Sequence, residues 1–144
     1  MYQFGETSKQ RLATCHKDLQ MIMGLAIMVS KVDFGIAEGY RSLEKQMQYF
    51  REGKSKIDGV KVKGKHNYRP SLAVDIYPFV NGKALWEDEH LSYLAGVIDS
   101  AAQTLLRDGS INHRIRWGGN WDMDGELLID QSFDDRPHFE LVSI

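Results

Sequence analysis

The sequence is organised around one stretch, Lys65-His66-Asn67-Tyr68-Arg69-Pro70-Ser71-Leu72-Ala73-Val74-Asp75-Ile76-Tyr77-Pro78. A histidine stands near its start, and Asp75 lies within the apolar run toward its end. The run from residue 72 to residue 77 is short and rich in aliphatic side chains, which predicts a buried strand. Because Pro70 disfavours helix at the residue before it, we expect an extended or turned loop between the histidine and the strand.

A second stretch, Asp134-Asp135-Arg136-Pro137-His138-Phe139-Glu140-Leu141, places another histidine among carboxylates. His66, Asp75 and His138 offer two imidazoles and one carboxylate, a common ligand set for catalytic zinc that leaves the fourth position to water. Asp135, three residues before His138, can act as a base beside that water. The alternative is that the two histidines are unrelated and that the acid only stabilises a turn or a helix.

Four short motifs occur in the same order as in a known family. They are Gly39-Tyr40-Arg41-Ser42, His66-Asn67-Tyr68 with Leu72-Ala73-Val74-Asp75, Trp117-Gly118-Gly119-Asn120-Trp121, and Asp135-x-x-His138-Phe139. Through them, residues 34–141 resemble the zinc peptidases of bacterial cell-wall peptides. This group includes the D-alanyl-D-alanine carboxypeptidases and dipeptidases and the phage L-alanyl-D-glutamate endolysins.

The chain departs from the family pattern at two places. Arg69-Pro70-Ser71 stands where the family has a single glycine, so His66 and Asp75 lie nine residues apart, two more than usual. Gly64 stands where the family usually has serine. The longer connection can form a bulge in the loop between the two ligands.

The resemblance implies a fold like that of the hedgehog and D-alanyl-D-alanine peptidase domains. It also implies one bound zinc, with His66, Asp75 and His138 as its ligands. Asp135 would be the catalytic base that accepts a proton from the attacking water and returns it to the leaving amine. Arg41 would share the oxyanion charge with the zinc.

The residues leave alternatives open for three of these side chains. Arg41 can equally be a surface arginine paired with Glu38 or Glu44. Asp134 is the alternative base, although it lies four residues before the second histidine and the family spacing is three. Glu140 either orients a ligand or faces solvent.

For function, the resemblance implies a zinc-dependent peptidoglycan hydrolase, a phage endolysin that cuts the L-alanyl-D-glutamate bond of the wall stem peptide. A D-alanyl-D-alanine carboxypeptidase is the alternative within the same class. A non-catalytic zinc module that binds wall peptide or a protein is the alternative from another class, and the acid at Asp135 argues against it. The stem peptide is the expected partner, and the chain is expected to act as a monomer.

The composition is that of one globular domain covering residues 1–144, with 42% apolar and 26% charged residues. A net charge of −2 gives no general affinity for nucleic acid or anionic membranes. Cys15 is the single cysteine, which excludes an internal disulfide, and its helical pattern indicates a buried thiol. Neither a membrane-spanning run nor a signal peptide is recognisable. We expect synthesis in the host cytoplasm, and the resemblance implies release to the wall by a phage holin.

The expected elements predict an α+β fold, a small, mostly antiparallel sheet with helices packed on it. Apolar periodicity predicts helices over residues 7–30 and from Asp88 to about residue 108. A helix capped by Ser42 is expected to end near Arg51, and Asn81-Gly82 is typical of a hairpin turn. Strands are expected at residues 34–38, 72–77, 114–117 and 138–141. His90 and His113 match no motif and are expected to be surface residues rather than ligands.

Residues 53–69 form a polar excursion, with Asp58-Gly59 as its expected hairpin turn and with Val60 and Val62 on the strand that follows. Its basic residues are Lys54, Lys56, Lys61, Lys63, Lys65 and Arg69. This charge can attract an anionic wall polymer, but a solvated hairpin without a binding role explains the pattern equally well.

The stretch Asn120-Trp121-Asp122-Met123-Asp124-Gly125-Glu126 resembles the opening of a calcium loop, with oxygen-bearing side chains at alternate positions and glycine at the sixth. Gln131 stands at the twelfth position, where such loops have a bidentate glutamate, so Asp130 or Glu126 would have to replace it. The alternative is an exposed acidic loop beside the active site. Calcium, if bound, is expected to order this loop and regulate activity without joining the chemistry.

Overall fold

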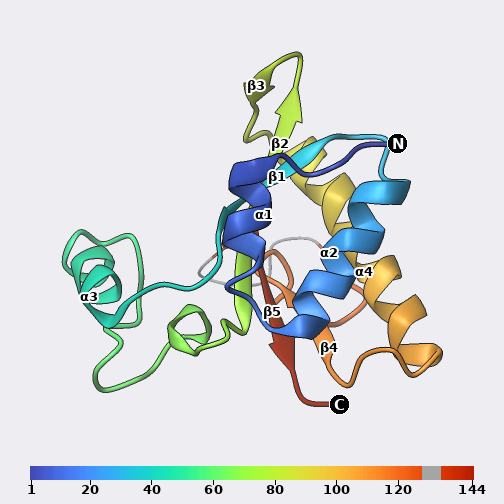
Figure 1. The fold of residues 1–144 in the computed structure, drawn as a ribbon. Coiled ribbons are helices and arrows are strands. Elements are labelled where there is room, and N and C mark those ends of the chain that lie inside the picture. Colours follow the sequence, from blue (N-terminus) through green and yellow to red (C-terminus); the bar gives the residue numbers. More distant parts are fainter. Residues whose placement is uncertain (128–133) are drawn as a thin grey trace.

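The computed structural model describes residues 1–127 and 134–144, which form an antiparallel sheet with helices packed on it (Figure 1). The sheet order is β1-β2-β5-β4, and the short β3 pairs with β2 beyond the end of β1. The strands are β1 (Phe34–Glu38), β2 (Ala73–Val80), β3 (Lys83–Ala84), β4 (Arg114–Trp117) and β5 (His138–Val142). This arrangement confirms the α+β fold expected from the sequence.

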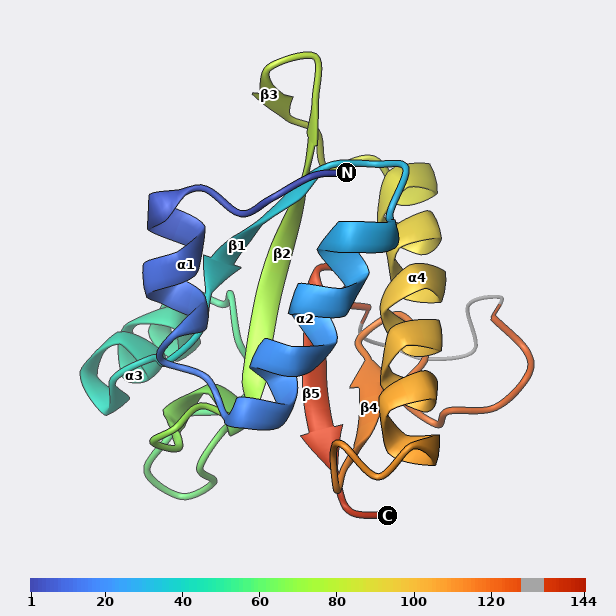
Figure 2. The ribbon, with the colours of Figure 1, turned by 45° about the vertical axis from the view of Figure 1, so that its right-hand side comes forward.

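The helices are α1 (Glu6–Leu12), α2 (Lys17–Val29), α3 (Leu43–Arg51) and α4 (Asp88–Arg107), with a short 3₁₀ turn, η1 (Lys65–Asn67). The α2–α4 pair covers one face of the sheet. Figure 2 shows α2 and α4 side by side in front of the sheet, while α3 stands apart from this pair. No helix in the described part of the chain is long and apolar enough to cross a membrane.

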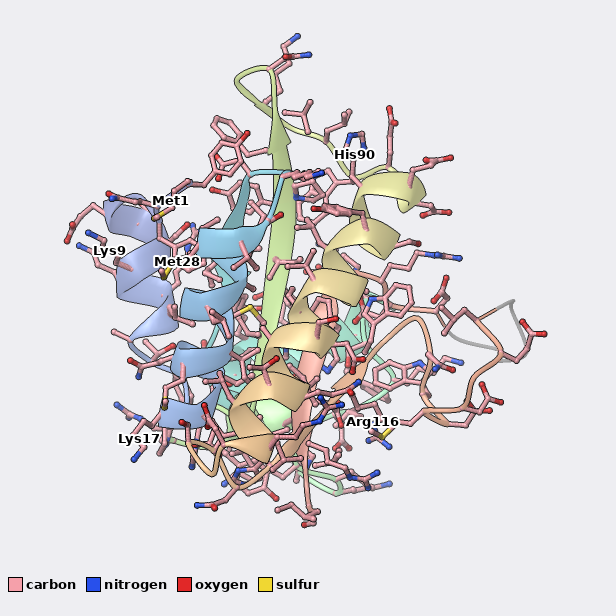
Figure 3. All side chains as sticks on the ribbon, turned by 90° about the vertical axis from the view of Figure 1, so that its right-hand side faces the viewer. Met1, Lys9, Lys17, Met28, His90 and Arg116 are labelled. Atoms are coloured by element: carbon pink, nitrogen blue, oxygen red, sulfur yellow. The ribbon has the colours of Figure 1, made fainter. Side chains whose placement is uncertain are left out.

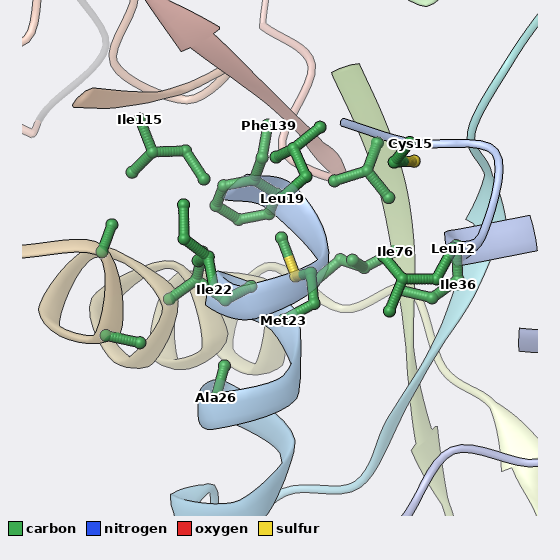
Figure 4. Close-up of a cluster of buried hydrophobic side chains, with 14 of the residues drawn as sticks. Leu12, Cys15, Leu19, Ile22, Met23, Ala26, Ile36, Ile76, Ile115 and Phe139 are labelled. Carbon is green, nitrogen blue, oxygen red and sulfur yellow. The ribbon is translucent and has the colours of Figure 1, made fainter. Parts of the chain in front are cut away.

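The core lies between the α2–α4 pair and the sheet (Figure 4). Leu19, Ile22 and Met23 of α2 are fully buried there, packed with Ile76 of β2 and Phe139 of β5. Burying an aliphatic side chain of this size contributes about 1.5–3 kcal/mol, so these contacts hold β2 and β5 firmly in place.

One helix predicted over residues 7–30 is in fact two, α1 and α2. The chain between them pairs with the segment that precedes β2: the backbone N–H of His16 donates to the carbonyl of Ser71, and Ser71 N–H donates to the carbonyl of Thr14. The imidazole Nδ1 of His16 then accepts the N–H of Asp18 at 2.9 Å and caps α2. These tertiary hydrogen bonds outweigh the continuous apolar periodicity, and the single-helix prediction is wrong.

The remaining elements agree with the sequence except in one segment. Ser42 caps α3 as expected, and the turn between β2 and β3 is formed by Asn81 and Gly82, both with positive φ. The strand expected through Val60 and Val62 is absent from the described structure. Instead, Oδ1 of Asp58 accepts the backbone N–H groups of residues 60–62, which closes a compact turn and removes those donors from any strand ladder.

The register of β2 and β5 decides which side chains face the core. Val74 pairs with Phe139, and Asp75 pairs with His138. Because successive side chains of a strand point to opposite faces, Val74 and Phe139 enter the core while Asp75 and His138 point to the other face. Polar side chains of β1, β2, β4 and β5 therefore gather on the face of the sheet that α2 and α4 leave uncovered.

Candidate active site

Two histidines and an aspartate from distant parts of the sequence converge on this polar face. Nε2 of His66, on η1, lies 3.2 Å from Oδ1 of Asp75, and Nδ1 of His138 lies 3.1 Å from the same oxygen. One ligand atom from each residue lies within 4.8 Å of the others, and the imidazole rings are 5.1 Å apart. The longer connection at residues 69–71 therefore leaves Asp75 beside both histidines. The peptide bond between Arg69 and Pro70 in this connection is cis.

Hydrogen bonds on the outer side of each imidazole fix which nitrogen carries a proton. Nδ1 of His66 lies 2.7 Å from the carbonyl oxygen of Gly39, which can only accept, so Nδ1 is the donor. Nε2 of His138 likewise faces Oε1 of Glu140 at 2.8 Å. In the neutral rings the inner nitrogens therefore carry lone pairs, which point at the same region as the Asp75 carboxylate. This donor set fits zinc, and outer-side partners of this kind are typical of zinc-binding histidines.

The electrostatics of the site favour a positive charge between these three residues. Burial would raise the pKa of Asp75, but the facing imidazoles lower it well below its usual range. Burial would lower the pKa of His138, but hydrogen bonds to Asp75 and Glu140 raise it to about 9. A proton and a metal ion compete for such a site, so metal binding there weakens as pH falls.

Asp135 lies beside this group and Asp134 does not. Oδ2 of Asp135 is 4.0 Å from Nδ1 of His138, and its pKa is raised, first by burial and then by the charge of Asp75. A carboxyl with a raised pKa can both accept and return a proton near neutral pH. Asp134 instead accepts a 2.8 Å hydrogen bond from Nε of Arg136.

Arg41 is buried at the same site rather than exposed on the surface. Its Nε and Nη2 donate to Oε1 of Glu38, and its Nη1 donates to Oε1 of Gln46 at 2.9 Å. Nη2 also lies 3.6 Å from Oδ2 of Asp75. The pairing with Glu38 named as an alternative does exist, but only 9% of Arg41 is exposed. Burial would raise the pKa of Glu38, and its bonds to Arg41 and Lys45 lower it overall.

Glu140 orients a site histidine instead of facing solvent. It is 6% exposed, accepts from His138 through Oε1, and accepts a 2.6 Å hydrogen bond from Nη2 of Arg116 through Oε2. Arg116 and Glu140 are paired residues on β4 and β5, which explains why their side chains meet on the same face. Arg116 matches no family motif, and only the pairing of its strand with β5 reveals the contact.

Gln46 is a second residue that the sequence reasoning missed. It is 2% exposed on a helix whose other side chains are largely exposed, and it joins Arg41 to the loop that follows α3. A polar residue among polar neighbours on a surface-type helix gives no sequence signal of such a role.

A cavity of about 690 Å³ opens over the site. Asp75, His138 and Asp135 line it together with Arg41, and the rings of Tyr49, Trp86 and Trp121 form parts of its walls. It is large enough for a short peptide, and its mixture of aromatic and charged groups is typical of a ligand pocket.

A second histidine–carboxylate group lies away from this cavity. Nδ1 of His113 lies 2.7 Å from Oδ2 of the buried Asp18, and His16 lies against the other side of that carboxylate. Nδ1 of His16 caps α2. His113 lies in the loop after α4 and contacts Asp18, so the group ties this loop to the start of α2. His113 is half-buried, with 30% of its side chain exposed. His90, at the first turn of α4, lies in the upper part of Figure 3, whereas Arg116 lies in its lower half.

The acidic loop that resembles a calcium site is described up to Leu127. In this part, backbone N–H groups of the loop donate to its own carboxylates. Oδ1 of Asp122 accepts the N–H of Asp124, and Oδ1 of Asp124 accepts the N–H of Glu126. Within residues 1–127 and 134–144 these carboxylates form no ligand group like the two above. Asp130 and Gln131, which the calcium hypothesis also requires, lie outside the described residues.

The comparisons with known proteins identify the family of the chain. The model of a family described as phage L-alanyl-D-glutamate peptidase matches residues 1–142. The L-alanyl-D-glutamate peptidase of Escherichia phage T5 is 28% identical over 143 residues, which cover 98% of each chain. The crystal structure of the Serratia marcescens L-Ala D-Glu endopeptidase ChiX superposes with a TM-score of 0.77 at 26% identity, covering 97% of this chain and 90% of that one. The chain therefore belongs to the phage L-alanyl-D-glutamate peptidase family.

Proposed function

We propose that this chain is a zinc peptidase that hydrolyses the bond between L-alanine and D-glutamate in the stem peptides of the bacterial cell wall. The observation that carries the proposal is the convergence of His66, Asp75 and His138 beside Asp135 at the base of the cavity. The bond follows from the relatives, whose names describe peptidases of L-alanyl-D-glutamate.

In this mechanism His66 Nε2, His138 Nδ1 and the Asp75 carboxylate would hold the metal. When bound, zinc supplies a Lewis acid that makes water a good nucleophile near neutral pH. Asp135 accepts a proton from the attacking water at its carboxylate and then donates it to the amine of the leaving D-glutamate. Its raised pKa favours the second of these transfers.

Arg41 contributes a fixed positive charge beside the reacting carbonyl. Its guanidinium donates three hydrogen bonds, two to Glu38 and one to Gln46, which fix its position, and Nη2 lies 3.6 Å from Oδ2 of Asp75. Fixed charges of this kind stabilise a developing oxyanion without reorganising during the reaction. Glu140 and Arg116 keep the His138 ring in the orientation that presents Nδ1.

The bond is identified by mass spectrometry of purified peptidoglycan digested with the zinc-loaded protein. New termini at L-alanine and D-glutamate are expected. Release of terminal D-alanine would instead identify a D-alanyl-D-alanine carboxypeptidase. Binding of wall peptide without any cleavage would identify a non-catalytic module.

The residue roles are tested with matched variants. Asp135→Asn should retain zinc and fold but lose activity by about 10²-fold or more, while the same change at Asp134 should have little effect. His66→Ala and His138→Ala should lower zinc content in elemental analysis, whereas His90→Ala should not. Full zinc in both site variants would place the metal elsewhere.

We further propose that the protein acts on the wall as a phage endolysin, as a monomer released by a holin. Calcium at residues 120–126 would regulate it by ordering the loop. Activity and thermal stability of the zinc-loaded protein in calcium, in magnesium and in neither test this, and identical values in all three would leave only a solvated loop.

A further inference from the structure

Three aromatic side chains at the β2–β3 hairpin form a group that the proposed mechanism does not use. They are Tyr77, Phe79 and Trp86, called here the aromatic strip. The ring centroids of Phe79 and Trp86 lie 6.4 and 6.1 Å from the centroid of Tyr77. Phe79 is 40% exposed and Trp86 is 52% exposed. Adjacent exposed rings mark an interaction surface, whereas single exposed apolar residues need no explanation.

The aromatic strip continues the face of the sheet that carries the site. Tyr77 and Phe79 follow Asp75 on β2 at steps of two residues, so their side chains point to the same face as its carboxylate. At about 3.4 Å per residue, the Cα atoms of Asp75 and Tyr77 lie roughly 7 Å apart. Trp86 lines the active-site cavity together with Asp75. The strip is therefore an extension of the cavity along β2.

The position of the central ring is set by the neighbouring strand. Gly35 of β1 pairs with Tyr77, and a Cβ at Gly35 would collide with the Tyr77 ring. The glycine therefore leaves the space in which this ring lies across β1. The rings of Phe79 and Trp86 meet the Tyr77 ring at interplanar angles of 83° and 49°. The strip is thus formed by the sheet itself, before any ligand arrives.

Charge is distributed unequally between the two ends of the cavity. Trp86 is followed directly by three acids, Glu87, Asp88 and Glu89. Residues 54–65, four of whose lysines line the cavity, contain five lysines and one acid, which gives a net charge of +4. Both ribbon views place the hairpin at one end of the sheet and the segment after α3 toward the other (Figures 1 and 2). An anionic part of a substrate is therefore favoured at residues 54–65 and disfavoured at the strip.

We propose that the aromatic strip binds the sugar ring that carries the stem peptide. This inference rests on the proposed function. In the wall, the amine of L-alanine is amide-linked to the lactyl group of an N-acetylated sugar, so the sugar lies on the acyl side of the scissile bond. Alanine and the lactyl group each span at most about 3.6 Å, which puts the sugar roughly 7 Å from the scissile carbonyl. This reach matches the spacing of Tyr77 from the proposed metal ligand Asp75.

The chemistry of the two halves of the substrate fits this orientation. The sugar is neutral, and its faces present C–H groups that pack on the electron-rich faces of aromatic rings. The leaving half begins with D-glutamate, whose carboxylate is favoured at residues 54–65 and repelled by residues 87–89. A sugar that covers about 50 Å² of apolar surface gains roughly 10-fold in affinity.

The experiment compares two synthetic substrates that differ only in the sugar. One is the stem peptide linked to N-acetylmuramic acid, and the other is the same peptide with a free lactyl group on L-alanine. Zinc-loaded wild type should favour the sugar-linked peptide by about 10-fold in kcat/KM, mainly through a lower KM. The preference should persist at high ionic strength, because it does not depend on charge.

The variants are Trp86→Ala, Trp86→Phe and, as a control, Phe50→Ala. Trp86→Ala should reduce the preference to below about 3-fold, while Trp86→Phe keeps a ring and should retain most of it. Phe50 is 46% exposed on α3 and does not line the cavity, so its removal should leave the preference unchanged. Calorimetric binding of N-acetylmuramyl-L-alanine, the acyl-side product, should be about 10-fold weaker in Trp86→Ala. Zinc content and circular dichroism show that all proteins are folded.

Four results would overturn the inference. Equal cleavage of the two substrates by wild type would remove the preference itself. A full preference in Trp86→Ala, or unchanged affinity of this variant for the acyl-side product, would exclude the strip as its source. An equal loss in Phe50→Ala would assign the effect to exposed aromatic residues in general. Loss of the preference in high salt would assign it to charge. Cleavage of neither substrate by wild type would instead refute the proposed function, so the two failures are distinguishable.

Discussion

A substitution at Gly118 is expected to displace the candidate base, Asp135, without changing that residue itself. A Cβ added at this residue would lie 2.8 Å from the carbonyl carbon of Asp135 and still closer to its carbonyl oxygen. Ordinary Cβ contacts begin near 3.4 Å, so the Asp135 backbone would have to retreat by at least about 0.6 Å. It cannot do so freely, because Asp135 N–H donates to the Gly118 carbonyl and Gly118 N–H donates to the carbonyl of His138.

We therefore expect Gly118→Ala to reduce kcat by about 10- to 100-fold, since a displacement of roughly 1 Å can cost about 10²-fold in rate. Stability should fall by about 1–3 kcal/mol, as for other overpacked sites, with zinc retained. The assay is turnover of the stem peptide by protein of measured zinc content, together with thermal unfolding.

Gly96→Ala provides the control, because a Cβ at this position of α4 meets nothing within 4 Å. That variant should be more stable by about 0.5–1 kcal/mol and fully active. A zinc-loaded Gly118→Ala protein with wild-type kcat would show that the contact does not position Asp135.

Other expectations concern the surroundings of the site and the core. Glu140→Gln should weaken zinc binding by about 10- to 100-fold in competition with a chelator, and Arg116→Gln should act in the same direction; unchanged affinity in both would contradict the orienting role. Burial would raise the pKa of Asp18, but hydrogen bonds from His113 and Asn112 lower it overall. Its stabilising contribution is thus present above the unfolded pKa of 3.8 and is lost as pH falls through the lower folded pKa. Urea unfolding at pH 6 and pH 3 should accordingly show wild type losing more stability than Asp18→Asn, and equal losses would refute the linkage. Burial raises the pKa of the Cys15 thiol to about 12, so a thiol reagent at pH 8 should label it only after unfolding, and rapid labelling of the native protein would be inconsistent with its burial.

Much of the sheet and the grouping at the site could be predicted because local patterns agreed with each other. The apolar run around Val74 predicts a strand with Asp75 on it, and the motif order brings His138 into the same site. Ser42 and Asn81 act through their nearest neighbours in sequence, so the helix cap and the hairpin turn are recognisable from the local sequence alone.

What could not be predicted depends on hydrogen bonds between distant segments. The apolar periodicity continues through Cys15, but the backbone pairing of its neighbours with Ser71 separates α1, which ends at Leu12, from α2. Val60 and Val62 alternate as in a strand, yet the Asp58 carboxylate captures the backbone donors that a strand would need. The role of Gln46 could not be predicted for the same reason, because its hydrogen-bond partners are Arg41 and the loop that follows its own helix.

The pairing of Asp75 with His138 across two central strands also means that the proposed metal site can form only when β2 and β5 are correctly aligned. Shifting β5 by one residue along β2 would turn His138 toward the helices and Phe139 toward the polar face, since side chains alternate along a strand. A chain misaligned in this way would keep most of its backbone hydrogen bonds but would have lost a ligand. Since a ligand that binds only the native state stabilises it in proportion to its affinity, metal present during refolding would selectively enrich correctly aligned molecules.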